Sequence, residues 1–368
     1  MTADLAEHIS ALPLIDNHVH GFWTSEVDRR RFENGLNEAN TEPLADFDSG
    51  FDTQLGFAVR AHCAPLLGLP AHVQPDEYWN VRHRYSPGQL AELFLAPALV
   101  SDWLVDTGLT DQIAGTDEMS RCVTGSVHEI VRLEQVAEQA LASGGDYIRA
   151  FRDILDARAA TAVATKTVLA YRGGFGGDLS VPADTEVTAA VERWRDTGDT
   201  RLTDRVLLRF GIHEALRVGK PLQFHVGLGD RDCDLHRTNP LLLLDFLRTC
   251  GQTSIVLLHC YPYEREAGYL AQAFNHVHMD TGLSVNHLGA RAGAFIARTL
   301  ELAPLRKLLY SSDAVGPPEL HYLGARLWRD GIATALADFV ARFEWSRDDA
   351  VRVATLIGRE NALRLYGL

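Results

Sequence analysis

The sequence alternates between short apolar runs and longer stretches with helical periodicity, and this alternation restricts the possible folds most strongly. Several of the runs are apolar almost throughout, which is typical of parallel strands that are buried on both faces. Between the later runs, as in "NPLLLLDFLRTC" and "ARAGAFIARTLELA", apolar residues recur at spacings of three and four, which predicts amphipathic helices. The predicted strands cover residues 12–16, 102–106, 127–133, 161–170, 221–226, 254–260, 276–282 and 307–313.

Eight strands with helices between them predict an α/β fold of the (β/α)8, TIM-like barrel type. The length of 368 residues fits one such domain with insertions, covering residues 1–368. A doubly wound open sheet is the structural alternative. It would more often carry a glycine fingerprint after its first strand, where this chain has "NHVHGFW".

One long interval, residues 24–99, breaks the alternation. It is polar and rich in proline and aromatic residues, and we expect a helical insertion after the first strand that covers the barrel mouth. Near the other end, Ser346 and Asp349 carry the spacing of a helix N-cap and predict a closing helix.

Composition excludes several classes of function. With 35 Lys and Arg against 49 Asp and Glu, the formal charge of −14 argues against a nucleic-acid surface, although a local arginine or metal can still attract an anionic substrate. The five cysteines are scattered without a C-x-x-C pair, which fits reduced cytoplasmic thiols. The start "MTADLAEHISALPL" lacks the basic residues of a signal peptide, and no run reaches membrane-spanning length. We therefore expect a cytoplasmic protein that acts on a small molecule, without nucleic-acid or membrane partners.

Two H-x-H motifs occur, and their positions distinguish them. Reactive groups of a (β/α)8 barrel come from the C-terminal ends of its strands. His18 and His20 close the first predicted strand, and residues two apart on a strand point to the same face, so both imidazoles can reach one metal ion. His276 and His278 lie at the start of the seventh predicted strand, at the opposite end of the barrel, and we interpret them as structural or solvent-exposed.

Further candidate ligands stand at other strand ends. Imidazoles and a carboxylate are the ligands of catalytic zinc, which leave one position for a water whose pKa the metal lowers. Asp313 is placed to accept that water's proton, and His259 to orient the nucleophile, polarise the substrate or bind a second ion. We expect one or two divalent ions, with zinc favoured and manganese as the alternative. The candidate ligands are His18, His20, His225, His259 and Asp313.

The remaining candidates have more than one interpretation. Lys166 in the fourth predicted strand is either carboxylated to bridge two metals, a proton donor of lowered pKa, or a partner of Glu134. Arg172, in the glycine-rich stretch "YRGGFGGD", is either a clamp for a substrate carboxylate or a surface residue. His62 and His83 in the insertion either contact the substrate or only support the insertion.

The ordered set "IDNHVH", "TKTVLAYRGG", "LQFHVGLGD", "VLLHCYP" and "LLYSSDAVGPPELHYLGA" resembles the amidohydrolase superfamily (amidohydrolase family 2). Within it, the chain is most similar to the amidohydrolase-type domain fused to type I glutamine synthetase-like proteins. The resemblance implies a distorted (β/α)8 barrel, one or two divalent metals and hydrolysis of an amide, ester or related bond. By position it makes His18, His20, His225 and Asp313 direct metal ligands, and His259 a further ligand or the catalytic histidine.

The resemblance also limits the functional conclusion. No glutamine synthetase domain follows "LYGL", so we expect no function that needs that partner in cis. The favoured function is a metal-dependent amidohydrolase, with Asp313, His259 and Lys166 as catalytic residues, acting on a small substrate that carries a carboxylate. The alternatives are a metal-dependent non-oxidative decarboxylase, since such lyases share nearly the same ligands, and a non-catalytic metal-binding barrel. A homo-oligomer is compatible by superfamily analogy alone.

Overall fold

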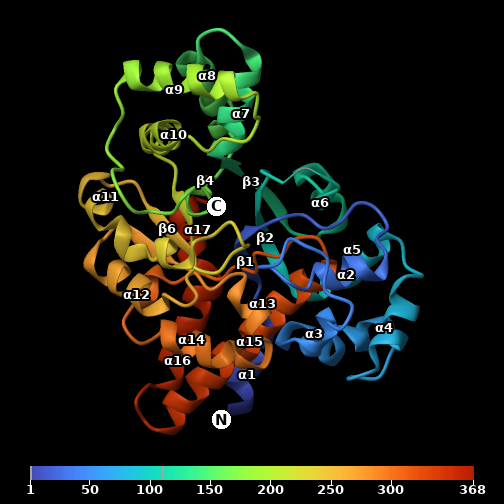
Figure 1. Cartoon of the computed structure of the whole chain (residues 1–368). Coiled ribbons are helices and arrows are strands. Elements are labelled where there is room, and N and C mark those ends of the chain that lie inside the picture. The colour runs from blue at the N-terminus through green and yellow to red at the C-terminus, as the bar shows by residue number, and fades with distance from the viewer. Residues whose placement is uncertain (1, 110) are drawn as a thin grey trace.

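The computed structural model of the protein describes residues 2–109 and 111–368 (Figure 1). Within them, seven strands form one sheet in which every strand pairs in parallel with its neighbour in chain order. The predicted parallel α/β architecture and its first seven strands are therefore confirmed. The strands are β1 (Leu14–Val19), β2 (Val100–Asp106), β3 (Ser126–Arg132), β4 (Ala164–Thr167), β5 (Leu222–Val226), β6 (Ile255–His259) and β7 (Val277–Met279).

Helices connect the strands and cover the sheet. They are α1 (Thr2–Ala11), α2 (Arg29–Asn34), α3 (Gln54–Ala58), α4 (Pro75–Arg82), α5 (Pro87–Leu95), α6 (Thr116–Cys122), α7 (Leu133–Ser143), α8 (Tyr147–Ala159), α9 (Asp184–Thr197), α10 (Arg205–Val218), α11 (Leu244–Thr249), α12 (Glu264–Ala273), α13 (Ser284–Leu288), α14 (Ala292–Thr299), α15 (Pro318–Ala341), α16 (Arg347–Thr355) and α17 (Asn361–Tyr366). Short 3₁₀ turns are η1 (Gly50–Asp52), η3 (Ala64–Leu67), η4 (Ala96–Ala98), η5 (Leu169–Tyr171), η6 (Leu235–Thr238), η7 (Pro240–Leu243), η8 (Gly289–Arg291) and η9 (Leu305–Lys307), and π-helical turns are η2 (Val59–Cys63) and η10 (Leu356–Glu360).

The strands lie in the core, where polar side chains such as Asp16, His18 and Gln223 are buried together with the apolar ones. Every residue of β1, β5 and β6 is buried, as expected for parallel strands covered on both sides. In Figure 1, α7–α10 gather at the top of the view, where they pack against one another beside β3 and β4, while α2–α5 lie on the right. No helix among the described residues is both long enough and apolar enough to cross a membrane.

The predicted eighth strand, residues 307–313, is not a strand in the structure. It keeps a single parallel bridge to β7, between Met279 and Leu308. On its other side, the backbone N–H of Asp313 donates to the carbonyl of His18 in β1 at 3.0 Å. The segment thus runs between β7 and β1 and bonds to both without forming a ladder.

Carboxylates explain why this segment departs from regular strand pairing. The Asp16 carboxylate accepts hydrogen bonds from the backbone N–H of Ser312 at 2.9 Å and from its hydroxyl at 2.5 Å. The Asp280 carboxylate accepts from the Ser311 hydroxyl at 2.8 Å. A carboxylate of β1 and a carboxylate directly after β7 therefore accept hydrogen bonds from this segment. In a regular ladder the N–H of Ser312 would instead donate to a backbone carbonyl of a neighbouring strand.

The chain between β1 and β2 is tied to the body of the protein by a buried ion pair. The Arg82 guanidinium at the end of α4 donates to both carboxylate oxygens of Glu319 in α15, at 2.6 and 3.1 Å. The Tyr78 hydroxyl donates to the same carboxylate at 3.0 Å. Farther along, the Ser346 hydroxyl accepts from the Asp349 N–H at the start of α16, as the capping pattern predicted.

Candidate functional site

Polar side chains gather where the strands end. His18 lies in β1 and His20 directly after it, His225 lies in β5, and His259 ends β6. Both His259 (φ 70°) and Asp313 (φ 49°) occupy the left-handed backbone region, which is unusual for residues with a side chain. Such conformations cost about 1–3 kcal/mol and cluster at functional sites. The strained backbone therefore marks the same end of the sheet that the sequence pattern indicated.

Three of the predicted ligands form one compact group. The Oδ1 atom of Asp313 lies 3.1 Å from Nε2 of His18 and 3.6 Å from Nε2 of His20. Ligand atoms of all three lie within 4.8 Å of one another, and the Asp313 side chain is only 10% exposed. His18, His20 and Asp313 form the candidate metal-binding trio.

Hydrogen bonds on the far side of each imidazole select its tautomer. Nδ1 of His18 lies 2.8 Å from Oε1 of Gln223, and Nδ1 of His20 lies 3.1 Å from the carbonyl oxygen of Asp106. Both oxygens accept, so both Nδ1 atoms donate, and the lone pair of each neutral ring stands on Nε2, facing Asp313. Burial lowers the pKa of His18 to about 3 and that of His20 to about 4, so both rings are neutral near pH 7.

His259 stands beside this trio. Its Nε2 lies 3.5 Å from Oδ2 of Asp313, and neither ring nitrogen has a hydrogen-bond partner among the described residues, although the side chain is fully buried. A buried ring with two unsatisfied nitrogens costs free energy unless a ligand, ion or water completes it.

His225 is adjacent to His259 but is not part of the trio. The two rings lie 4.5 Å apart, centre to centre. Nε2 of His225 lies 2.8 Å from the carbonyl oxygen of Leu228 and 3.1 Å from the Tyr171 hydroxyl. The structure thus brings His225 next to the other candidates, with one nitrogen already engaged by protein groups.

The donor set of the trio fits a divalent cation. Two neutral imidazoles and one carboxylate are the ligands of catalytic zinc sites, and they leave a position for water or substrate. Oδ1 of Asp313 is buried and has no hydrogen-bond partner among the described groups, as expected of an atom that binds an ion. Burial also raises the pKa of Asp313 to about 6, although His20 and Lys166 act to lower it. The positive charge near this carboxylate therefore does not fully offset the cost of its burial.

Lys166 lies within the same group, not beside Glu134. Its Nζ is 3.2 Å from Nε2 of His18 and 3.9 Å from Oδ2 of Asp106. Glu134 instead accepts from the Thr167 hydroxyl at 2.7 Å, and no ion pair joins it to Lys166 in the described structure. The alternative in which Lys166 pairs with Glu134 is therefore wrong. Burial lowers the pKa of Lys166, which favours its neutral amine relative to an exposed lysine.

A cavity of about 240 Å³ opens onto these residues. Arg172 lines it, and its Nε and one terminal nitrogen donate to the carbonyl oxygens of Leu202 and Tyr171. The predicted residues that line the cavity are His20, Lys166, Arg172, His225 and Asp313.

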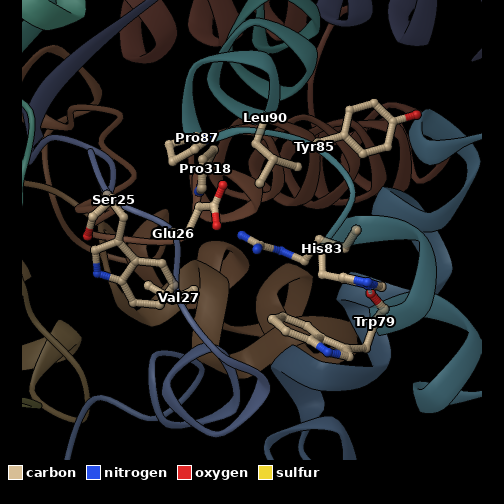
Figure 2. Close-up of a pocket in the computed structure, with 11 residues that line it drawn as sticks. Ser25, Glu26, Val27, Trp79, His83, Tyr85, Pro87, Leu90 and Pro318 are labelled. Carbon is tan, nitrogen blue, oxygen red and sulfur yellow. Dashed lines mark hydrogen bonds between the residues drawn. The ribbon is translucent and has the colours of Figure 1, made fainter.

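His62 and His83 do not reach this cavity, so their prediction as residues of the same site is not supported by position. His83 lines a separate pocket of about 180 Å³, where Figure 2 shows it beside Trp79. Its Nδ1 lies 2.9 Å from the Trp79 carbonyl, one helical turn earlier. His62 lies in η2, and its titratable neighbours include Arg326 and Asp330 of α15. Sequence alone did not show how the chain between β1 and β2 folds back.

Several residues of the site were missed. Asp106 ends β2 and Arg132 ends β3, and the guanidinium binds the carboxylate at 2.7 Å on its closest contact. Both obey the strand-end rule that identified the histidines, so this signal could have found them. Glu38, between α2 and η1, also lines the cavity, and no sequence pattern singled it out.

The second H-x-H pair has no part in this site. His276 lies against Cys250, with Nε2 and Sγ 3.4 Å apart, and His278 is buried within β7. Neither lines the cavity or belongs to the trio, in agreement with their interpretation as structural residues.

Comparisons with known proteins converge on one family. A family model described as Amidohydrolase matches residues 154–368. Protein fluG of Emericella nidulans is 27% identical over 418 aligned positions, which cover 100% of this chain and 47% of fluG. The chain thus spans about half the length of this curated relative.

Solved structures agree with this result. A protein from Lactobacillus casei ATCC 334 that is assigned as a metal-dependent hydrolase superposes with a TM-score of 0.85 at 28% identity, covering 99% of this chain and 97% of the other. A uronate isomerase from Bacillus halodurans C-125 superposes with a TM-score of 0.68 at 13% identity, covering 100% and 96%. The second match shows a shared fold alone.

Proposed function

This chain belongs to the amidohydrolase family, and from that premise we propose that it hydrolyses an amide bond of a small, carboxylate-bearing substrate with the help of a divalent metal. The resemblance seen in the sequence is thereby confirmed at the level of the family. Zinc is the proposed ion, because neutral imidazoles with one carboxylate suit it well.

The main support for the proposal is the orientation of the trio, in which both histidines turn Nε2 toward the Asp313 carboxylate. Nε2 of both His18 and His20 faces one oxygen of Asp313, within 3.1 and 3.6 Å. Accepting partners on each Nδ1 hold the two rings in the tautomer that a metal ligand requires. His259 and Lys166 complete the group from β6 and β4.

When bound, a zinc ion would supply Lewis-acid polarisation and would lower the pKa of a water molecule. Asp313 would take the proton released as water adds to the substrate carbonyl, and would return it to the leaving nitrogen. Lys166, beside His18, or His259, beside Asp313, would donate a hydrogen bond to the oxygen that gains negative charge. Arg172, at the cavity wall, would bind the substrate carboxylate.

The finer architecture belongs to the same proposal. The segment 307–313, which bonds to β7 and to β1, would take the position of the eighth strand and close a (β/α)8 barrel. Helices α2–α5 between β1 and β2 would cover the mouth, and Glu38 from this part of the chain does line the cavity.

Elemental analysis of the purified protein tests the metal. We expect about one or two equivalents of zinc or manganese per chain, lost in His18→Ala and retained in the matched control His276→Ala. Two equivalents that fall to one in Lys166→Ala would assign Lys166 to a bridging role. Absence of metal after supplementation with either ion would overturn the proposal.

A second experiment separates hydrolysis from decarboxylation. A panel of small carboxylate-bearing amides is incubated with the metal-loaded protein in ¹⁸O-labelled water. Incorporation of one ¹⁸O atom into the released acid supports hydrolysis. Release of carbon dioxide without incorporation of label from water would replace the hydrolase with a lyase.

A further inference from the structure

Glu38 stands at the candidate site without an assigned role. It belongs to the loop between α2 and η1, and its half-buried side chain lines the same cavity as His20 and Asp313. The loop is well held at this point, because Oδ1 of Asn37 accepts from the backbone N–H groups of Ala39 and Asn40, both at 3.1 Å.

The loop is also connected to another segment that lines the cavity. Glu42 forms an ion pair with Arg231, which follows Asp230 of the cavity wall directly in the chain. These contacts therefore hold the loop that carries Glu38 in place at the edge of the cavity.

The carboxylate of Glu38 has no hydrogen bond or ion pair with any described residue. Its charged neighbours include Asp313 and Asp230, of the same sign, and Lys166. Burial raises the pKa of Glu38 to about 8, with Asp313 and Asp230 adding to the effect, and Lys166 offsets only part of it. A carboxyl group in such surroundings lacks a cation.

Two arginines that line the cavity already form ion pairs with other carboxylates. Arg132 binds Asp106 at 2.7 Å and Arg201 binds Asp232 at 2.6 Å. Arg172 differs, because its guanidinium donates hydrogen bonds to backbone carbonyls and has no carboxylate within 4.0 Å in the described structure.

Asp230, in the same cavity, also has no ion pair among the described residues, but its carboxylate accepts from the Asp232 N–H at 2.8 Å. Glu38 has neither kind of partner in the described structure, and Arg172 is a guanidinium without a carboxylate. A ligand that carried only a carboxylate would satisfy Arg172 and would leave Glu38 without a partner. A ligand with an ammonium group as well would satisfy both.

We infer that the substrate is zwitterionic, with its ammonium group held by Glu38 and its carboxylate by Arg172. As a statement about the substrate this inference rests on the proposed function, and it narrows the substrate class to amides of amino-acid type. Glu38 would contact the substrate without joining the metal ligands, because the candidate ligand group comprises only His18, His20 and Asp313 among the described residues.

Calorimetric titration of the zinc-loaded protein tests this without turnover. The probes are ω-amino acids from glycine to 6-aminohexanoate, each compared with the unsubstituted acid of equal chain length, so that the series covers a range of charge separations. We expect at least one amino acid to bind about tenfold more tightly than its matched acid, as one ion pair in a partly buried site allows.

Variants identify the groups that recognise the two charges. Glu38→Gln should bring the amino acid and its matched acid to similar affinity, and Glu38→Asp should retain part of the preference. Asp48→Asn, an exposed position in the same stretch between α2 and η1, should leave the preference unchanged. Arg172→Gln should weaken binding of both members of each pair.

Equal affinity within every pair in the wild-type protein would overturn the inference, as would a preference that survives Glu38→Gln. Retention of acid binding in Arg172→Gln would overturn the assignment of the carboxylate. Hydrolysis that is indifferent to the amino group would contradict the inference alone, whereas a Glu38-dependent preference in a protein that hydrolyses none of the amides would contradict only the proposed reaction.

Discussion

Nδ1 of His18 donates a hydrogen bond to Oε1 of Gln223 at 2.8 Å, across the core from β1 to β5. Gln223 is fully buried, and its amide nitrogen donates to the carbonyl of Asn17 at 2.9 Å and to the Tyr366 hydroxyl at 2.9 Å. Because both donor bonds orient the amide, its oxygen is presented to His18 in one direction. The neutral tautomer of His18 therefore depends on Gln223.

Gln223→Leu should weaken metal binding. The substitution removes the acceptor for Nδ1, so the ring loses its fixed orientation and tautomer. Loss of such supporting bonds lowers metal affinity by about 10–100-fold. Competition with a chromophoric chelator measures the change.

Tyr366→Phe is the matched control for Gln223→Leu. It removes one bond to the amide nitrogen and leaves Oε1 in place, so its effect on metal affinity should be smaller. Equal affinity of the wild type and Gln223→Leu would show that His18 is not held in this way.

Removal of the metal should lower thermal stability. A ligand that binds only the folded protein stabilises it by about 2.7 kcal/mol at a free concentration of 100 times its Kd. For 368 residues, an unfolding entropy of about 2.1 cal/mol/K per residue gives about 1.3 °C per kcal/mol, and hence a fall in Tm of roughly 3–4 °C after treatment with a chelator. Scanning calorimetry of the chelated and zinc-restored protein measures this shift.

His18→Ala supplies the control for the chelator experiment. Its Tm should be the same with chelator and with zinc. A shift of similar size in this variant would place the stabilising ion elsewhere in the protein.

Arg82→Met should strongly destabilise the fold. The side chains of Arg82 and Glu319 are 4% and 0% exposed, so the substitution leaves a buried carboxylate without its cation. Breaking a buried pair in this way costs about 3–5 kcal/mol. Urea-induced unfolding should show that loss in the free energy of unfolding.

The double variant Arg82→Met with Glu319→Gln distinguishes charge from packing. Without the charge of Glu319 most of the lost stability should return. A double variant as unstable as Arg82→Met would mean that the cost comes from packing of the arginine side chain.

Acidification should destabilise the protein partly through His278. Burial lowers the pKa of this residue to about 4, below its value of 6.5 in an unfolded chain. Between these values the unfolded chain binds a proton that the folded protein does not, so the free energy of unfolding falls as the pH falls. From pH 7 to pH 5 this effect amounts to about 2 kcal/mol.

The His278→Gln variant should therefore lose about 2 kcal/mol less than the wild type between pH 7 and pH 5 in urea-induced unfolding. His236→Gln is the matched control, because the His236 side chain is 77% exposed. Identical losses in the wild type and in His278→Gln would show that His278 is protonated alike in both states.

The strands were predictable from sequence because burial on both faces leaves a mostly apolar run, as in β6, which is apolar up to His259. The limits appear where side chains replace backbone partners. β4 ends at Thr167 instead of continuing to residue 170, and there Glu134 accepts from the Thr167 hydroxyl and the Val168 N–H. The segment 307–313 differs for a similar reason, since carboxylates of β1 and the β7 end take its polar groups.

The site was predictable as far as the strand-end rule extends. His18, His20 and Asp313 come together because successive strand ends share one edge of the sheet. Glu38 and His83 come from the chain between β1 and β2, whose path depends on tertiary contacts such as that of Arg82 with Glu319. One enters the cavity and the other lines a different pocket, and local sequence does not distinguish them.

The contact of Tyr366 with Gln223 has a consequence for biosynthesis. Tyr366 donates to Asn17 at 2.8 Å, next to His18, and lies in α17, more than three hundred residues later in the chain. The ribosome must therefore release residue 366 before the orientation of His18 can be completed. A nascent chain shorter than this holds its histidines without their final support, and high-affinity metal capture follows translation of α17.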